Sequence, residues 1–142
     1  MASCLARLCG TALGVPPFEF ADVSASKGIG SYIMAEGMGG GAAAADFDDD
    51  GDIDLFVPTG AGVPDQLYRN LGNGQFEEIA QQAGLDSTVA NRTALWFDYD
   101  ADGVLDLLVA NDVEDSPTMY RLYRQVASGQ FEDVTVEAGL II

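Results

Sequence analysis

Short apolar segments alternate with acidic and glycine-containing turns along most of the chain, and no segment keeps a helical period for long. Short segments of this kind, bounded by turn residues and rich in β-branched or aromatic side chains, are typical of β-strands. The expected strands are residues 42–46, 55–57, 66–70, 75–79, 94–97, 107–110, 120–124 and 130–134. One helical turn is expected at residues 81–83. The pattern therefore predicts an all-β protein.

The predicted strands belong to an internal repeat. The Leu-Tyr-Arg of residues 67–69 recurs at 122–124, and the Gly-Gln-Phe-Glu of residues 74–77 recurs at 129–132, in each case 55 residues later. A partial third copy, Phe-Ala-Asp-Val-Ser at residues 20–24, precedes them. Each whole copy contains four predicted strands with apolar faces, as in a propeller blade. Because stable repeat arrays need about three or more units, the chain is expected to be an incomplete propeller or one completed by other chains.

The repeats divide the chain into four parts. Residues 1–17 are small and apolar and resemble the remnant of a secretion signal, and the sequence leaves the pairing of Cys4 and Cys9 open. Residues 18–29 are a repeat tail, whose first part is expected to be an orphan N-terminal strand that pairs with another chain or with the edge of the second repeat. Residues 30–85 and 86–142 are the two whole repeats.

Aromatic residues are expected in the packed regions of this architecture. Trp96 and Phe97, just before the second acidic cluster, are interpreted as blade core rather than as a platform for a ligand. Tyr68, Tyr120 and Tyr123 are expected to pack between blades. Because aromatic side chains bury large areas, these positions predict where the core lies.

The charge of the chain is strongly acidic and unevenly distributed. The sequence has 23 acidic and 6 basic residues, a net charge of −17 and no histidine. This balance argues against nucleic acid as a partner, and the missing histidine removes the usual general base and the usual zinc ligand. No apolar run reaches the ~18 residues of a membrane-spanning helix, so membrane insertion is not expected. No nucleophile–base pair is visible, and a non-catalytic protein is predicted.

Ten of the carboxylates crowd into two short loops at matching places in the repeat, residues 46–54 and 98–106. Each loop has Asp at positions 1, 3, 5 and 9 and Gly at position 6. Calcium takes about six to eight oxygen ligands in irregular geometry, whereas magnesium demands a stricter octahedron. With the carbonyl of position 7 added, we expect two calcium sites. The expected ligands are Asp46, Asp48, Asp50, Asp52 and Asp54 in the first, and Asp98, Asp100, Asp102, Val104 and Asp106 in the second.

The loops are distinct from EF-hand loops after the first six positions. An EF-hand carries a bidentate Glu at position 12 between two helices, whereas Val57 and Val109 stand there in predicted strands. The first loop contains two additional carboxylates. We expect Asp49 to face solvent and Asp52 to offer only its backbone carbonyl, and the added charge predicts that the first site binds calcium more tightly than the second.

These motifs resemble the FG-GAP/VCBS repeats of the integrin α-chain β-propeller, and most closely the acidic-repeat propellers of the ASPIC and cartilage acidic protein type. The resemblance covers residues 18–140 and rests on Asp-Tyr-Asp-Ala-Asp-Gly-Val-Leu-Asp-Leu at 98–107, Leu-Tyr-Arg-Asn at 67–70, Gly-Gln-Phe-Glu-Asp-Val-Thr at 129–135 and Ala-Gly-Leu at 138–140. It implies a calcium ion between the first two strands of each blade. It also implies an extracellular or cell-surface location and a role in adhesion or recognition.

Three functions are compatible with these expectations. The first is a non-catalytic calcium-binding module for a protein or glycan ligand. The second is a structural subunit that self-associates through unpaired blade edges, as a homo-oligomer or as part of a larger propeller. The third is a fragment of a carbohydrate-active enzyme with a calcium propeller. The absence of recognisable catalytic groups favours the first two.

Overall fold

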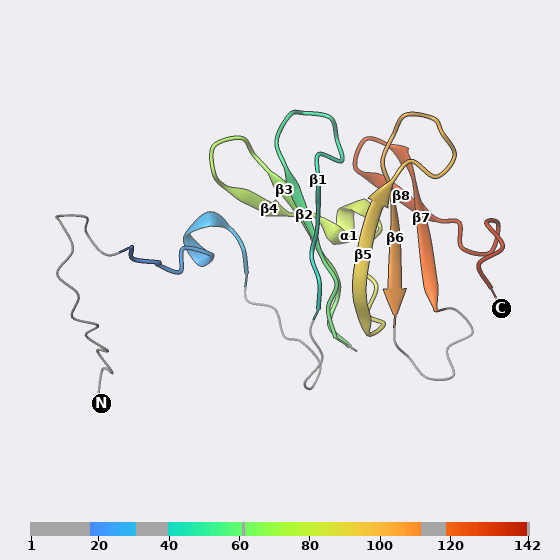
Figure 1. Ribbon diagram of the computed structural model, residues 1–142, viewed down its shortest axis with the longest axis horizontal. Helices are drawn as coiled ribbons and strands as arrows, with labels where there is room; N and C mark the ends of the chain where they lie inside the picture. Colours follow the sequence, from blue (N-terminus) through green and yellow to red (C-terminus); the bar gives the residue numbers. More distant parts are fainter. Residues whose placement is uncertain (1–17, 31–39, 61, 112–118, 142) are drawn as a thin grey trace.

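The computed structural model describes residues 18–30, 40–60, 62–111 and 119–141. Two antiparallel four-stranded sheets stand side by side, and sequence neighbours are also neighbours in each sheet (Figure 1). Blade 1 contains β1 (Ala43–Ala45), β2 (Asp54–Val57), β3 (Gln66–Asn70) and β4 (Phe76–Glu78). Blade 2 contains β5 (Asn91–Phe97), β6 (Asp106–Asn111), β7 (Tyr120–Ala127) and β8 (Gln130–Asp133). The predicted all-β architecture of two four-stranded blades in an open, incomplete propeller is confirmed.

The acidic loops connect the first two strands of each blade. Asp54 pairs with Ala45 in blade 1, and Asp106 pairs with Phe97 in blade 2, so each loop closes a hairpin. Both loops lie at the same end of the molecule, at the top of Figure 1. β5 begins three residues earlier than expected, because residues 91–93 pair with β6 across an irregularity in the register. The blades therefore present their two acidic loops next to each other.

Aromatic side chains pack between the blades. Phe47, Trp96 and Phe131 form a ring cluster with centroids 5.8–6.1 Å apart, and Phe56 meets the edge of Trp96 at 6.4 Å. The indole Nε1 of Trp96 also donates to the carbonyl of Ala43 at 3.3 Å. Each aromatic pair adds about 0.5–1.5 kcal/mol beyond the area that it buries. The expected core position of Trp96 is confirmed, and the two blades share one core.

Of the three tyrosines expected to pack between the blades, one does so. Tyr123 is buried in the core shared by the blades and is 5% exposed. Tyr68 is 2% exposed but lies outside that core, where its hydroxyl accepts the N–H of Gly30, and Tyr120 is 40% exposed. Tyr120 is the first residue of β7 and lies opposite Ala110, at the far end of the blade from the acidic loops. Its position on the rim of the sheet explains why it does not join the packing.

A single helical turn, α1 (Ala80–Ala83), follows β4 and ends at Gly84 in the left-handed conformation. It contacts β3 of its own blade and β8 of blade 2, with Ala80 and Ala83 buried. The predicted turn is thus confirmed and starts one residue early. Within the described residues, no helix has the length and apolar character that crossing a bilayer requires.

The expected N-terminal strand does not form in this structure. Residues 18–23 have no regular structure, Phe18 and Phe20 are 90% and 99% exposed, and the segment continues into a 3-10 turn, η1 (Ala25–Lys27). The segment lies beside blade 1, on the side away from blade 2 (Figure 1), so pairing with the second repeat is wrong. The physical reason is that a strand of this type pairs with the third strand of a blade, and β4 and β8 already occupy those edges.

Candidate metal centres

Loop 1 (residues 46–54) and loop 2 (residues 98–106) follow the same backbone path. The fourth residue has a positive φ in both, 58° at Asp49 and 62° at Ala101, and the sixth residue is a glycine at 93° or 88°. Glycine adopts this conformation without penalty, and Asp tolerates it better than Ala does. The spacing of the aspartates and the glycine therefore specifies one loop shape twice.

Side-chain carboxylates hold each loop closed. The first Asp accepts two backbone N–H groups, those of the fifth and sixth residues, and the Asp at position 5 accepts the N–H of position 7. The distances are 3.0 and 2.8 Å at Asp46 and 2.9 Å at Asp50, and 3.1 and 3.0 Å at Asp98 and 2.8 Å at Asp102. These bonds curl the chain so that alternate side chains meet inside the loop.

The ninth residue of each loop links the loop to the third strand of its blade. Asp54 accepts the N–H of Phe47 at 3.1 Å and that of Asn70 at 2.7 Å. Asp106 accepts the N–H of Tyr99 at 2.8 Å and that of Gln125 at 2.9 Å. Both carboxylates are buried, with exposed fractions of 0% and 1%. Position 9 is therefore a structural tie as well as a candidate ligand.

Burial dominates the electrostatics of Asp54. It raises the pKa of this carboxyl to about 6, although the hydrogen bonds from Asn70 and Phe47 lower it. The negative charges of Asp48 and Asp50 raise the pKa further. A positive ion nearby would favour the ionised form instead.

The structure brings three carboxylates together in each loop. One oxygen from each of Asp46, Asp48 and Asp50 lies within 4.8 Å of the others, and the same holds for Asp98, Asp100 and Asp106. Asp54 and Asp102 lie in the same loops but outside these two groups. Each of the two loops thus gathers three carboxylates, and the two groups differ in whether position 5 or position 9 belongs to them.

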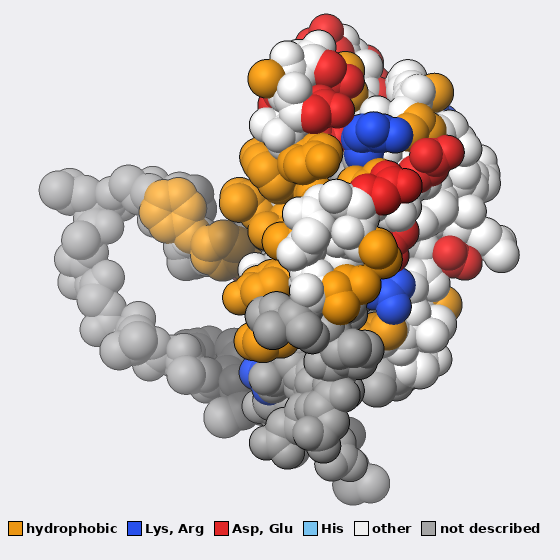
Figure 2. All heavy atoms as spheres, turned by 90° about the vertical axis from the view of Figure 1, so that its right-hand side faces the viewer, with side chains coloured by type: hydrophobic (Ala, Val, Ile, Leu, Met, Phe, Trp, Pro, Cys, Tyr) orange, Lys and Arg blue, Asp and Glu red, His pale blue; other side chains and the backbone are white. Residues whose placement is uncertain are grey.

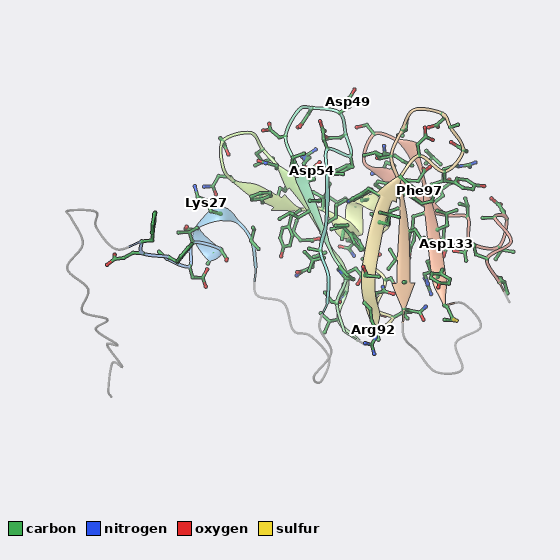
Figure 3. All side chains as sticks on the ribbon, viewed as in Figure 1. Lys27, Asp49, Asp54, Arg92, Phe97 and Asp133 are labelled. Atoms are coloured by element: carbon green, nitrogen blue, oxygen red, sulfur yellow. The ribbon has the colours of Figure 1, made fainter. Side chains whose placement is uncertain are left out.

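The two additional carboxylates of loop 1 point away from the cluster. Asp49 is exposed and projects from the top of the loop (Figure 3). The carboxylate of Asp52 is directed at the β3–β4 turn, because its Oδ2 would lie 2.6 Å from a methyl group added at Gly72. This orientation agrees with the expectation that Asp52 offers a metal only its carbonyl.

Asp48 is the carboxylate of loop 1 whose surroundings most favour a nearby cation. Its Oδ1 is buried and has no hydrogen-bond partner among the described residues. Burial raises the pKa of Asp48, and the charges of Asp50 and Asp46 raise it further, while Arg69 opposes them. A buried acceptor without a donor costs about 1–3 kcal/mol, and more when it is charged. A cation among these oxygens would relieve that cost.

Comparison with known families agrees with this geometry. Residues 46–109, from the first Asp of loop 1 into β6, match the family described as FG-GAP-like repeat. This segment is similar to an FG-GAP-like repeat. The match spans both acidic loops, and the predicted resemblance to FG-GAP repeats is confirmed for it. No curated protein was found to match the chain.

The donor set of the two FG-GAP-like loops fits a hard cation. Every side-chain donor is a carboxylate oxygen, and neither loop contains sulfur or imidazole. Oxygen-only sets of this kind suit calcium, magnesium or manganese rather than zinc or copper. Irregular loops with carboxylates and carbonyls favour calcium among these ions.

A cleft of about 470 Å³ separates the two FG-GAP-like loops. Its walls are residues 46–49 of loop 1, residues 102–105 of loop 2 and residues 125–128, which form the end of β7 and the start of the β7–β8 turn. Gln125 donates from Nε2 to the carbonyl of Phe47 at 3.1 Å and accepts the N–H of Gly129 at 3.3 Å. Sequence reasoning missed this residue. The available signal was its place in the repeat, where the equivalent Asn70 donates to Ile53 at 3.1 Å.

Proposed function

We propose that this chain is a non-catalytic calcium-binding repeat module of an extracellular or cell-surface protein, acting in recognition or adhesion. The single observation that carries the proposal is the buried, unpartnered Oδ1 of Asp48 inside the group formed with Asp46 and Asp50. The same group type recurs 52 residues later in loop 2. The FG-GAP-like match supports a repeat module of the β-propeller type.

Calcium, when bound, would supply the positive charge that holds the converging carboxylates together. In loop 1 the residues to hold it are Asp46, Asp48 and Asp50, with the Asp52 carbonyl and Asp54 at the edge. In loop 2 they are Asp98, Asp100 and Asp106, with Asp102 and the Val104 carbonyl at the edge. The side chains of Asp54 and Asp106 also tie each loop to its blade. Ion binding would therefore fix the blade hairpins as well as the loops.

Thermal melting in calcium and then in chelator tests the metal. For a dissociation constant of ~10⁻⁴–10⁻³ M, about 10 mM calcium stabilises the folded chain by about 1.4–2.7 kcal/mol per site. Calcium should raise the melting temperature more than magnesium does. A melting temperature that is the same in calcium and in chelator would refute the proposal.

Two substitutions in loop 1 make this test specific. Asp48→Asn removes a carboxylate of the cluster, and Asp49→Asn removes the same charge from an outward-pointing neighbour. Asp48→Asn should abolish most of the calcium effect at loop 1, whereas Asp49→Asn should keep it. Equal losses would mean that only the net charge of the loop matters. Asp100→Asn is the corresponding change in loop 2.

We place recognition at the cleft between the loops, because it lies beside both candidate ion sites and has polar and apolar walls. Val126 lines it and is 47% exposed. Val126→Trp would fill part of the cleft without adding charge. Binding to arrays of glycans and matrix proteins should require calcium and be lost in this variant. Binding that persists in Val126→Trp would remove the cleft from the proposal while leaving the metal sites intact.

A further inference from the structure

Three turns in the chain have the same backbone shape. We call them tail 1 (residues 23–29), tail 2 (residues 79–85) and tail 3 (residues 134–140). Tails 2 and 3 follow β4 and β8, the fourth strands of the two blades, and tail 1 follows the N-terminal segment that repeats their sequence. Each contains one glycine with a positive φ, 84° at Gly28, 80° at Gly84 and 73° at Gly139. Each has the same three backbone hydrogen bonds. Their donor N–H groups are Lys27, Gly28 and Ile29 in tail 1, Ala83, Gly84 and Leu85 in tail 2, and Ala138, Gly139 and Leu140 in tail 3.

Two of the three tails close against the fourth strand of a neighbouring blade. A methyl group added at Gly84 would lie 2.9 Å from the carbonyl oxygen of Phe131 in β8. A methyl group added at Gly28 would collide in the same way with the carbonyl of Phe76, the equivalent residue of β4. A methyl group added at Gly139 would meet no atom of the described residues within 4 Å beyond its chain neighbours. Tail 3 therefore has the same backbone shape as tails 1 and 2, but no fourth strand of the described residues lies against its glycine.

The outer face of blade 2 repeats the face that blade 1 buries. Blade 1 packs against blade 2 through Ala43, Phe56, Leu67, Ile79 and Leu85, all of which belong to the shared core. Their repeat equivalents on blade 2 are Leu95, Leu108, Leu122, Val134 and Leu140, and the register places Leu95, Leu108 and Leu122 side by side on one face.

This outer face is apolar and partly open, since Leu95 is exposed whereas Leu122 and Val134 are buried, with exposed fractions of 2% and 3%. Leu95 is 59% exposed where its equivalent Ala43 is 8% exposed, and Val136 of tail 3 is 71% exposed. Figure 2 looks at this side of the molecule, and hydrophobic side chains gather on it. A blade that fits here would present the surface that blade 2 presents to blade 1, including the carbonyl of the phenylalanine in its fourth strand.

We propose that tail 3 and the outer face of blade 2 bind blade 1 of a second copy of this chain. β4 of blade 1 carries the required carbonyl at Phe76, and tail 1 of the same chain covers it. Tails 1 and 3 have the same turn, so they compete for that carbonyl. Tail 1 acts as an internal cap, and association proceeds when tail 3 of another copy displaces it.

Tail 1 is suited to being displaced. The turn η1 contains no buried residue, whereas Ile79, Ala80, Ala83 and Leu85 of tail 2 are all buried. The hydrogen bond from Gly30 N–H to the hydroxyl of Tyr68, at 3.2 Å, fastens the end of tail 1 to blade 1. Lys27 lies at the end of the segment that faces β4 (Figure 3). A contact of different faces on two copies is heterologous, so it generates rings or open chains rather than a symmetric dimer.

Four chains measured by sedimentation over a wide concentration range in calcium test this proposal. The average mass of the unmodified chain should rise with concentration. Gly28→Ala, whose methyl group expels tail 1 from Phe76, should associate at concentrations lower by about tenfold, which corresponds to about 1.4 kcal/mol. Gly139→Ala, whose methyl group blocks the docking of tail 3, should stay monomeric. Gly62→Ala is the matched control, because Gly62 has a φ of 82° and open space around it but lies outside the tails.

The double variant Gly28→Ala/Gly139→Ala distinguishes specific docking of tail 3 from nonspecific hydrophobic association. The double variant exposes the same apolar residues as Gly28→Ala but lacks a tail that fits, so it should be monomeric. Circular dichroism and melting confirm that each variant is folded. The proposal is overturned if the unmodified chain and Gly28→Ala are monomeric throughout, or if Gly139→Ala or the double variant associates as strongly as its parent. The measurement does not depend on calcium occupying the loops, which chelator controls would establish separately.

Discussion

The buried carboxylate of Asp65 accepts a hydrogen bond from the side-chain amide of Asn91 and so joins the β2–β3 loop of blade 1 to the first residue of blade 2. The same carboxylate accepts the N–H of Thr59 at 2.8 Å, and the N–H of Asn91 donates to the carbonyl of Thr59 at 3.0 Å. Asp65 is 2% exposed. A titratable group therefore lies at the connection between the blades, at the end remote from the metal loops.

This position predicts a pH dependence of stability. Burial raises the pKa of Asp65 to about 6, although hydrogen bonds from Thr59 and Asn91 and the charge of Arg121 lower it. Because the folded chain then binds this proton more tightly than the unfolded chain, stability falls as the pH rises from about 4 to about 6 and stays low above that range. In chelator, the unfolding free energy at pH 5 should exceed that at pH 7.5 by an amount to which Asp65 contributes on the order of 1–2 kcal/mol.

Asp65→Asn isolates this contribution from that of the other carboxylates. The amide cannot ionise, so the variant should lose part of the gain on acidification. Melting curves of both chains at the two pH values give the difference directly. An identical pH dependence in Asp65→Asn and the unmodified chain would show that Asp65 does not titrate in this range.

Ala101 of loop 2 predicts a stabilising substitution. Its φ of 62° is unfavourable for an L-residue with a Cβ by roughly 1–2 kcal/mol, and the equivalent residue of loop 1 is Asp49. Ala101→Asn should stabilise the chain by about 0.5–1 kcal/mol, because Asn adopts this conformation more readily. Ala101→Val, which is β-branched, should destabilise it. Chemical denaturation in saturating calcium measures both, and equal stabilities of the Asn and Val variants would contradict the argument.

The strands were predictable where local signals bound them on both sides. Gln66–Asn70 was predicted to the residue, because Pro64 precedes it and a glycine turn follows it. The N-terminal segment forms no strand within this chain, since a strand needs a partner and its sequence says nothing about which edges are already paired. In the loops, spacing placed Asp54 and Asp106 at position 9. The hydrogen bonds that bury them come from Asn70 and Gln125, 16 and 19 residues away, which loop spacing does not reveal.

The two loops should differ in calcium affinity through charge rather than through ligation. Loop 1 has Asp49 and Asp52 in addition, and neither carboxylate joins the cluster. Their attraction for a cation acts over a distance through partly exposed surroundings, so salt should screen it. Isothermal titration of Asp50→Ala and Asp102→Ala, each of which leaves one intact site, should show tighter binding at loop 1. That advantage should shrink at high salt, and equal affinities at low salt would remove the ranking.

Gln125 and Gln130 form a natural comparison for the cost of an unsatisfied buried group. Gln125 is 6% exposed, and its side-chain amide donates to the carbonyl of Phe47 and accepts the N–H of Gly129. Gln130 is exposed and donates to the carbonyl of Gln82 at 2.9 Å. Gln125→Ala leaves buried groups without partners and should lower the unfolding free energy by about 2–3 kcal/mol, whereas Gln130→Ala should change it by less than about 0.5 kcal/mol.

The same pair tests whether the end of β7 supports the first metal loop. Phe47 is the second residue of loop 1, so the loss of its hydrogen bond from Gln125 should loosen the loop from across the cleft. Calcium affinity at loop 1, measured in the Asp102→Ala background, should therefore fall in Gln125→Ala and be unchanged in Gln130→Ala. A destabilised Gln125→Ala chain with unaltered affinity would separate the two roles, because the end of β7 would then support the core without shaping the site.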